Sequence, residues 1–330
     1  MSTCFGSGSQ PKCPQGLRSE IGEISQCFIC RYFPVDFEQV YDTYYPTHQF
    51  RCLILGMQAN MMSSHRFSAI LWLSLVAISS TAVAHENILK TTVDPSNDAW
   101  DYSDGPNGPA HWGDLNPSWR TCNEGQNQSP INIDTSNLVY DEKLDAPATH
   151  EYVETPAYVL NNGHTAQVIW PAGWIYIDGK NYSMTGFQFH SPSEHTIDGT
   201  SYPLEMQIVH MTDEGDYAVV VILSSIQEMV NGWVAQFWDQ IPSLSSIWQP
   251  VPVGNLSPDG FRVNFSKYYR YSGSLTSPDC QENVIWTVLS TVYEISPGQI
   301  EHLRSVFPDA NNRPIQPLGD RKVSYPKASA

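Results

Sequence analysis

The sequence predicts a mostly β fold built as one main domain, and three observations support this. Short runs of β-branched and aromatic residues recur between turn signals from about residue 129 to 290, which is typical of successive strands and turns. One of them, residues 217–223 (YAVVVIL), is apolar without interruption, as expected for a strand buried on both faces. Helical patterns are few, so strands must supply most of the regular structure.

The elements are predicted in chain order from local composition. Residues 85–115 are rich in Asp, Asn, Gly and Pro, which predicts an irregular N-terminal arm. Strands are predicted over residues 166–169, 174–177, 217–223 and 284–289. Turns are predicted at Asn-Gly and Asp-Gly pairs, namely residues 162–163, 178–179 and 198–199.

Two segments have helical features. Apolar residues at helical spacing predict a helix over residues 226–240. Ser296 followed by Pro297 predicts the N-cap and first turn of another short helix. Since no repeat or low-complexity tract separates these elements, one domain is expected.

A segment with the features of a secretory signal peptide lies inside the chain. Residues 61–66 supply a basic start, residues 67–78 are apolar, and Ala82-Val83-Ala84 resembles a cleavage site. The apolar run is short for a membrane span. We interpret the segment as a signal peptide; the alternative is an uncleaved anchor, with residues 67–84 in a membrane.

This segment divides the chain into three parts. They are a doubtful N-terminal extension (residues 1–60), the signal peptide or signal anchor (residues 61–84) and the main domain (residues 85–330). We expect the extension to lie upstream of the true start. Either interpretation places the main domain outside the cell or in the lumen of the secretory pathway.

The charge of the chain is acidic. Asp and Glu outnumber Lys and Arg by 34 to 17, and after residue 84 the counts are 29 and 12. Such a surface repels nucleic acid and anionic membranes, so no nucleic-acid partner is expected. The acids are scattered and form no runs, which makes them a weak indication of a mineral-binding surface.

Cysteines and sequons are compatible with secretion. Only Cys122 and Cys280, two of the seven cysteines, follow residue 84, and two distant cysteines in a secreted domain favour one disulfide. Candidate glycosylation sites are the N-x-Ser sequons at Asn127, Asn181, Asn255 and Asn264. Pro follows the sequon at Asn127 and at Asn255, which disfavours their use.

Two strand-like segments carry the candidate site. In residues 186–190 (GFQFH), period-2 alternation puts Gln188 and His190 on one face and the two phenylalanines on the other. Residues 205–210 (EMQIVH) form the second segment, and residues 193–199 (SEHTIDG) lie between the two.

Together these segments resemble the metal-binding strands of the α-type carbonic anhydrases. Further segments match that family in order: residues 112–115 (WGDL), 128–133 (QSPINI), 161–165 (NNGHT), 273–278 (GSLTSP) and 312–318 (NRPIQPL). The resemblance covers about residues 99–323. It implies a single α-carbonic-anhydrase-like domain with a central twisted, mostly antiparallel sheet of about ten strands and few short helices.

In that family three histidines hold a catalytic zinc ion, at the positions of Gln188, His190 and Gln207. Three neutral imidazoles and an open position lower the pKa of zinc-bound water to about 7, which supplies the hydroxide that hydrates CO2. A carboxamide oxygen is a weaker ligand, so one good ligand remains. We therefore expect no cofactor, or zinc only if the altered site still binds it.

The resemblance also implies catalytic roles. Thr276 would orient the hydroxide while Glu194 accepts the Thr276 proton. His164 would carry protons to bulk water through a chain of waters ordered by Tyr102 and Asn162.

Other residues would support the site. The substrate pocket would be lined by Val209, Val219, Leu275, Ser277 and Trp286. Glu205 would accept a proton from the third ligand, Gly186 replaces a glutamine that supports the first ligand, and Cys122 and Cys280 would form the family's disulfide.

Each of these polar residues also has a structural interpretation. His195 and His210 resemble core histidines of the family, and His164 can be a polar residue of an Asn-Gly turn. Gln188 and Gln207 are expected to hydrogen bond to each other, to His190 and to trapped water, which fills the place of the ion.

We therefore expect a secreted protein with impaired or absent hydration of CO2, acting as a binding or structural module for an unknown extracellular partner. The alternative is a carbonic anhydrase with a degenerate metal site, whose substrates are CO2 and bicarbonate. A further alternative, from the charge of −17, is an acidic protein of extracellular matrix or mineral.

Overall fold

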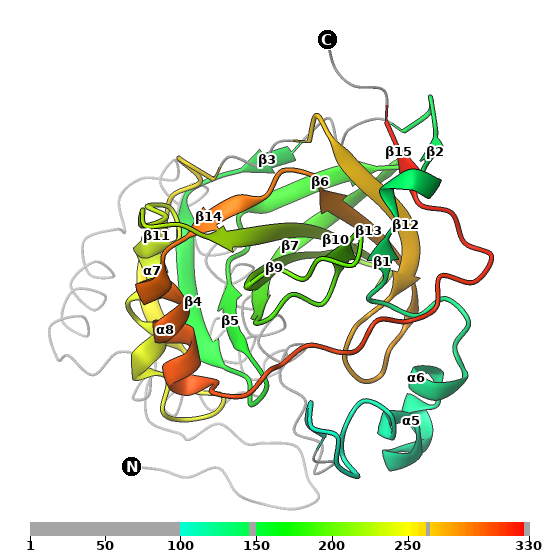
Figure 1. The fold of residues 1–330 in the computed structure, drawn as a ribbon. Helices are drawn as coiled ribbons and strands as arrows, with labels where there is room; N and C mark the ends of the chain where they lie inside the picture. The colour runs from blue at the N-terminus through cyan, green and yellow to red at the C-terminus, as the bar shows by residue number, and fades with distance from the viewer. Residues whose placement is uncertain (1–99, 145–149, 262–264, 327–330) are drawn as a thin grey trace, which may run out of the picture. The chain divides into compact units, whose positions relative to one another are not determined.

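A computed structural model describes residues 100–144, 150–261 and 265–326, which belong to one compact unit built on a large sheet (Figure 1). The expected extension, the signal peptide or anchor and the sequon at Asn264 lie outside the described residues. Residues 100–111 contain no helix or strand, as predicted for this part of the arm, whereas Trp112–Leu115 at its predicted end form a short helix. No described helix is both long enough and apolar enough to cross a membrane.

The strands confirm the mostly β prediction. They are β1 Asn132–Ile133, β2 Val139–Tyr140, β3 His150–Tyr152, β4 Thr155–Asn161, β5 Ala166–Ile169, β6 Gly173–Ile177, β7 Lys180–His190, β8 Thr196–Ile197, β9 Leu204–Met211, β10 Tyr217–Ile226, β11 Val251–Leu256, β12 Tyr268–Ser274, β13 Glu282–Leu289, β14 Tyr293–Ile295 and β15 Ser324–Tyr325. The sheet runs in the order β11-β4-β5-β7-β9-β10-β13-β12-β15-β2, with β3, β6 and β14 alongside, while β1 pairs with β8 separately.

The sheet is larger than expected and mostly antiparallel. It has 13 strands among the described residues, against about ten predicted, because short strands extend its edges. Parallel pairing is confined to β10 with β13, β10 with β14, and β15 with β2. Strand β10 therefore has neighbours of both kinds, since it pairs antiparallel with β9.

Among the described residues the helices are short: α5 Trp112–Leu115, α6 Thr121–Glu124, α7 Ala235–Trp238 and α8 Pro297–Val306, with the 3-10 turns η1 Pro117–Trp119, η2 Thr135–Asn137 and η3 Ile241–Ser243. Helix α8 begins as predicted, with Ser296 as N-cap in a reciprocal capping box with Gln299.

The helix predicted over residues 226–240 is wrong over most of its length. Strand β10 continues to Ile226, and only α7 is helical. Met229 is 74% exposed and Val230 is 61% exposed, so the apolar spacing there does not mark a buried helix face. The side chain of Asn231 instead accepts hydrogen bonds from the backbone of the following turn.

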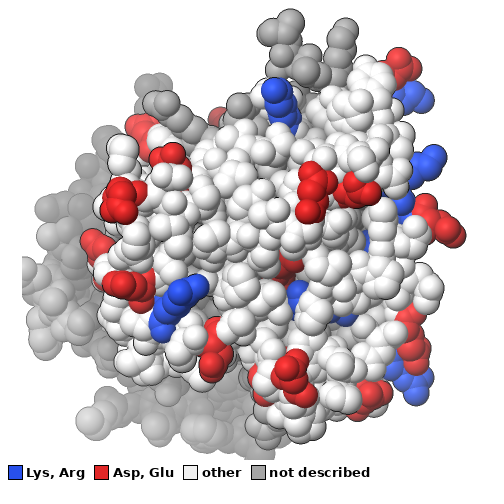
Figure 2. Space-filling view, in the orientation of Figure 1, with Lys and Arg blue, Asp and Glu red and all other residues white. Residues whose placement is uncertain are grey.

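Apolar cores cover both faces of the sheet. One contains Phe187 and Phe189 with the aromatic residues around α7. The other contains Val219, Val221 and Trp286. Acidic side chains are scattered over the visible face and form no single patch (Figure 2). The candidate polar residues lie on the side of β7 and β9 that faces away from the phenylalanines.

Candidate functional site

Strands β7 and β9 bring the candidate residues together. They pair antiparallel, with Gln188 opposite Gln207 and His190 opposite Glu205. Paired residues present their side chains on the same face of a sheet. All four polar side chains therefore share one face, and Phe189 packs in the core behind it.

Gly186 marks a bulge in this pairing. The register shifts between Met184 and Gly186, and the φ angle of Gly186 is +150°. A Cβ atom at this position would lie 2.0 Å from the carbonyl oxygen of Val168. No side chain fits there, so the glutamine that would support the first ligand has no room in this backbone.

His190 is fixed with one ring nitrogen left without a partner. Its Nδ1 lies 2.6 Å from the carbonyl oxygen of Asn311, and only 1% of the residue is exposed. Because a carbonyl oxygen only accepts, Nδ1 carries a proton, and in the neutral imidazole Nε2 then keeps a lone pair. That Nε2 is buried and has no hydrogen-bond partner among the described residues. The expected hydrogen bond from the glutamines to His190 is absent there.

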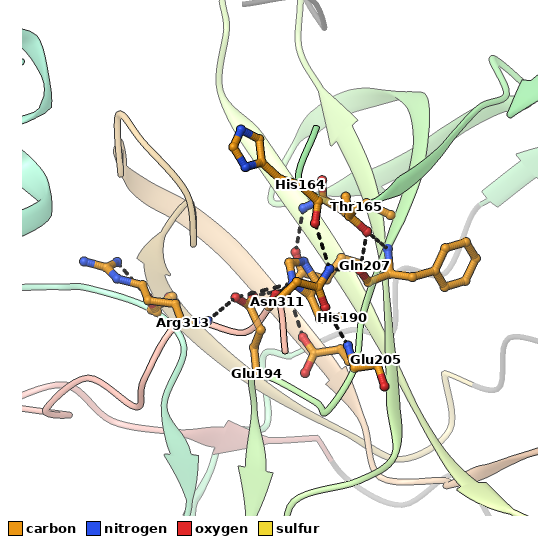
Figure 3. Close-up of polar contacts among 12 residues, drawn as sticks. His164, Thr165, His190, Glu194, Glu205, Gln207, Asn311 and Arg313 are labelled. Atoms are coloured by element: carbon orange, nitrogen blue, oxygen red, sulfur yellow. Dashed lines mark hydrogen bonds and ion pairs between the residues drawn. The ribbon is translucent and has the colours of Figure 1, made fainter. Parts of the chain in front are cut away.

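Gln207 lies between two buried carboxylates (Figure 3). Its Nε2 donates to Glu194 at 2.7 Å and to Glu205 at 2.9 Å, and all three residues are at most 2% exposed. Ionised carboxylates only accept, so the amide must turn its nitrogen toward them and its Oε1 away. That Oε1 accepts from Gln188 Nε2 at 3.1 Å, which confirms the predicted bond between the two glutamines.

A histidine holds the inner carboxylate. His195 donates its backbone N–H to Glu205 Oε2 at 2.8 Å, and its Nδ1 lies 2.9 Å from Oε1. Burial acts to raise the pKa of Glu205, but the charge and hydrogen bonds of His195, with the bond from Gln207, outweigh it and lower that pKa to about 2. Glu205 is therefore a buried anion. His195 and His210 are both fully buried, as their core interpretation predicts.

Both carboxylate oxygens of Glu194 accept hydrogen bonds, and neither bond comes from Thr276. The backbone N–H of Arg313 donates to Oε1 at 2.9 Å, and Gln207 donates to Oε2. Thr276 is 3% exposed, and its hydroxyl has no hydrogen-bond partner in the part of the chain described. The pairing implied by the resemblance is replaced here by a bond to the glutamine.

His164 lies in the predicted turn and stacks on an aromatic ring. Asn162 Oδ1 accepts the backbone N–H groups of His164 and Thr165, which fixes the turn. The imidazole points away from the carboxylate cluster (Figure 3) and lies against Trp100, with ring centroids 3.5 Å apart. Burial lowers the pKa of His164 to about 4, with Asp101 acting in the opposite direction. At neutral pH the ring stays uncharged, which is unfavourable for proton transfer there.

Removing the Trp100 ring that stacks on His164 should return the pKa of this histidine toward its ordinary value. In Trp100→Ala, we expect the pKa of His164 to rise from about 4 toward about 6.5, because water then reaches the imidazole. An NMR pH titration measures it, with the signal assigned by its loss in His164→Gln. Tyr176→Ala, which removes an exposed ring elsewhere, is the control. A pKa still near 4 in Trp100→Ala would contradict Trp100 as the cause.

The residues expected to wall a substrate pocket are also brought together. Val209, Val219 and Trp286 are register partners on β9, β10 and β13. Leu275 packs against the same core, and Ser277 lies in the turn that ends at Cys280.

Tyr102 and the disulfide belong to the surroundings of the site. The Tyr102 ring lies edge-on to His190, with centroids 6.4 Å apart, and burial raises the pKa of its hydroxyl well above 10. Cys122 and Cys280 form the predicted disulfide.

Two site residues were not predicted from the sequence. Asn311 lies 121 positions from its partner His190, and no local pattern indicates such a contact. Gln167 could have been found, because the predicted strand at residues 166–169 contains one polar residue. It accepts a bond from Asn162 Nδ2 at 3.3 Å and lies opposite Gln188 in the register of β5 and β7.

These residues do not fit a catalytic zinc ion. His190 Nε2 is the one imidazole nitrogen available at the family's three ligand positions, and the Oε1 of Gln207 already accepts from Gln188. No group of three His, Cys, Asp or Glu with metal-binding geometry occurs among the described residues. Zinc sites use nitrogen, sulfur or carboxylate ligands, and this arrangement offers mainly carboxamides.

Comparison with known proteins agrees with the fold. Residues 107–327 match the model of the eukaryotic-type carbonic anhydrase family. A carbonic anhydrase of Pectobacterium carotovorum is 39% identical over 233 residues, which cover 68% of this chain and 90% of that protein.

Two solved structures are similar over the same part of the chain. An α-carbonic anhydrase of Thermovibrio ammonificans, solved with the inhibitor sulfanilamide, is 38% identical with a TM-score of 0.65, covering 69% of this chain and 100% of that one. Dioscorin, solved in complex with ascorbate, is 35% identical with a TM-score of 0.65, covering 69% of this chain and 98% of that one.

Proposed function

Because the chain belongs to the eukaryotic-type carbonic anhydrase family, we propose that it keeps the family's fold as a binding module and has impaired or absent hydration of CO2. The observation that carries the proposal is the hydrogen bonding of Gln207. Its amide group satisfies two buried carboxylates and accepts from Gln188. These bonds bring the polar groups together without an ion between them.

Other features support this proposal. The backbone at Gly186 has no room for a side chain that would orient a first ligand. Burial against Trp100 holds the pKa of His164 to about 4, which is far below the pH at which a proton carrier is needed. Dioscorin was solved with ascorbate, so a relative of this fold holds a small organic molecule.

The test is a joint measurement on the purified full chain. Zinc per chain is measured by mass spectrometry, hydration of CO2 by stopped flow, and sulfanilamide binding by calorimetry. We expect zinc far below one ion per chain, hydration near the uncatalysed rate and no saturable sulfanilamide binding. Stoichiometric zinc together with catalysed hydration would overturn the proposal.

One observation favours a second candidate, a carbonic anhydrase with a degenerate metal site. His190 Nε2 has a free lone pair in a buried position, which is where a ligand nitrogen would be expected. Zinc bound through His190 would be lost in His190→Ala, and hydration would be lost with it. The same joint measurement on that variant separates the two candidates.

We also propose that the protein is secreted and glycosylated at Asn181. Asn181 and Ser183 are both exposed on β7, next to the turn that joins it to β6. Asn255 instead donates its side chain to Glu154 and is followed by Ser257-Pro258.

The glycosylation prediction concerns one site. In a eukaryotic secretory host, we expect a glycan whose removal by glycosidase lowers the apparent mass. Asn181→Gln should abolish this shift, whereas Asn255→Gln should leave it unchanged. A shift that persists in Asn181→Gln would assign the glycan to another sequon.

A further inference from the structure

A row of carboxamides crosses three neighbouring strands on the site face of the sheet. Gln167 on β5 is the register partner of Gln188 on β7, and Gln188 is the partner of Gln207 on β9. Gln167 and Gln188 are partly exposed, whereas Gln207 is 2% exposed. The row therefore leads from solvent to the buried carboxylates.

The two ends of the row have fixed orientations. At the buried end, the carboxylates force Gln207 to present Oε1, so Gln188 turns its Nε2 inward. At the open end, Asn162 Oδ1 accepts from the backbone, so its Nδ2 donates to Gln167 Oε1. In the middle of the row, Gln167 Nε2 and Gln188 Oε1 are the amide atoms that these hydrogen bonds do not use.

The middle of the row is unbonded. Among the described residues, no hydrogen bond joins Gln167 Nε2 to Gln188 Oε1, although the two residues are direct cross-strand partners. His190, two residues along β7 on the same face, adds the free Nε2. A group that fits between them must accept from one amide and donate to the other. Hydroxyl groups do both, whereas carboxylates only accept and ammonium groups only donate.

Two buried carboxylates lie at the inner end of the row. Gln207 Nε2 donates to Glu194 and to Glu205. Each carboxylate already has a histidine beside it, His190 at 3.5 Å from Glu194 and His195 at 2.9 Å from Glu205. A bicarbonate or carboxylate ligand would therefore bring a further negative charge close to two carboxylates whose basic neighbours are already engaged.

We propose that this row is a binding site for a small, uncharged, polyhydroxylated molecule of the sugar or polyol class, with one ligand hydroxyl bridging Gln167 and Gln188. The inference rests on the proposed function, because a metal at the three ligand positions would reorganise these amides.

The test uses the full chain and two probes, glucose and myo-inositol, with bicarbonate and acetate as anionic comparators. Saturation-transfer NMR and calorimetry detect binding. We expect saturable binding of at least one probe and weaker or no binding of the anions. Gln188→Ala should weaken it about tenfold, the effect of losing one hydrogen bond in a buried site. Gln167→Ala should act in the same direction.

Gln240→Ala, which removes an exposed glutamine next to α7, is the matched control and should bind like the parent. Circular dichroism confirms that each variant folds, and if Gln188→Ala does not, Gln167→Ala decides.

Three results would overturn the proposal. The first is no saturable binding of either probe, which would mean that only a water molecule bridges the two amides. The others are tighter binding of bicarbonate than of either probe, and equal changes of probe affinity in Gln188→Ala and Gln240→Ala. Zinc and hydration are measured on the same samples. If the protein is free of zinc, inactive and binds neither probe, the result contradicts this inference and leaves the proposed function standing. If it carries zinc and hydrates CO2, the result contradicts the proposed function.

Discussion

The double variant Gln188→His/Gln207→His is expected to bind about one zinc ion per chain, with an affinity at least about a thousandfold above that of the parent. The gain is large because two imidazoles join His190 Nε2, which is already buried and free. Outer hydrogen-bond partners alone change zinc affinity by about 10–100-fold each, and direct ligands contribute more. Gln207 Nε2 lies 2.9 Å from Glu205, so an imidazole in its place has an acceptor for its outer N–H.

Competition with a chelating dye measures the zinc affinity, and stopped flow measures hydration of CO2. The single variants Gln188→His and Gln207→His should each fall between the parent and the double variant. Gln240→His adds a surface histidine and controls for adventitious zinc. Parent-like zinc affinity in the double variant would mean that the pocket is no longer shaped for an ion, even with its ligands restored.

Hydration by the double variant should remain limited. Position 186 cannot hold a supporting side chain, and the pKa of His164 stays near 4 under Trp100. Adding Trp100→Ala should therefore raise the hydration rate further at neutral pH, and added imidazole buffer should raise it in the same way. A double variant that is already insensitive to buffer would show that proton transfer does not limit it.

Much of the fold could be predicted because its signals are local. Strand β5 has the predicted bounds, and the N-cap of α8 lies at Ser296. The run at residues 217–223 is a strand, but β10 extends to Ile226 because its end pairs with β14. The helix predicted from there onward failed because apolar spacing does not show whether a side chain is buried. Met229 demonstrates this by its exposure.

The site could be predicted only in part, since its contacts join distant segments. The opposition of Gln188 and Gln207 follows from two matched strands. The position of Gln167 opposite Gln188 does not, because β6 lies between β5 and β7 in the chain and no single turn sets their register. The sequence also does not show that the Gln207 amide turns toward both carboxylates. That orientation depends on the position of Glu194, which accepts a hydrogen bond from the backbone N–H of Arg313.

Gln207→Leu is expected to lower the free energy of unfolding by about 3–5 kcal/mol at neutral pH. Hydrogen bonds to charged groups contribute about 1.5–3 kcal/mol each, so the loss of two of them at buried carboxylates is strongly destabilising. Gln207 makes two such bonds, to Glu194 and Glu205, in a place that is almost fully buried. Leucine has a similar size but no donor, so the packing is kept while both bonds are lost.

Urea unfolding followed by tryptophan fluorescence measures the change, with Gln188→Leu as the matched control. Gln188 is partly exposed and makes one bond to an uncharged amide, so its loss should cost only about 1 kcal/mol.

A double-mutant cycle separates a charge effect from a packing effect. Glu205 keeps His195 in both proteins, whereas Glu194 loses its side-chain donor in Gln207→Leu. In Glu194→Gln the buried charge that accepts from this donor is absent, so Gln207→Leu should cost less stability in that background than in the parent at the same pH. An equal cost in both backgrounds would mean that the variant suffers from packing alone. Gln207 would then not be the group that compensates the two carboxylates, and its amide would not have replaced a metal ion in balancing their charge.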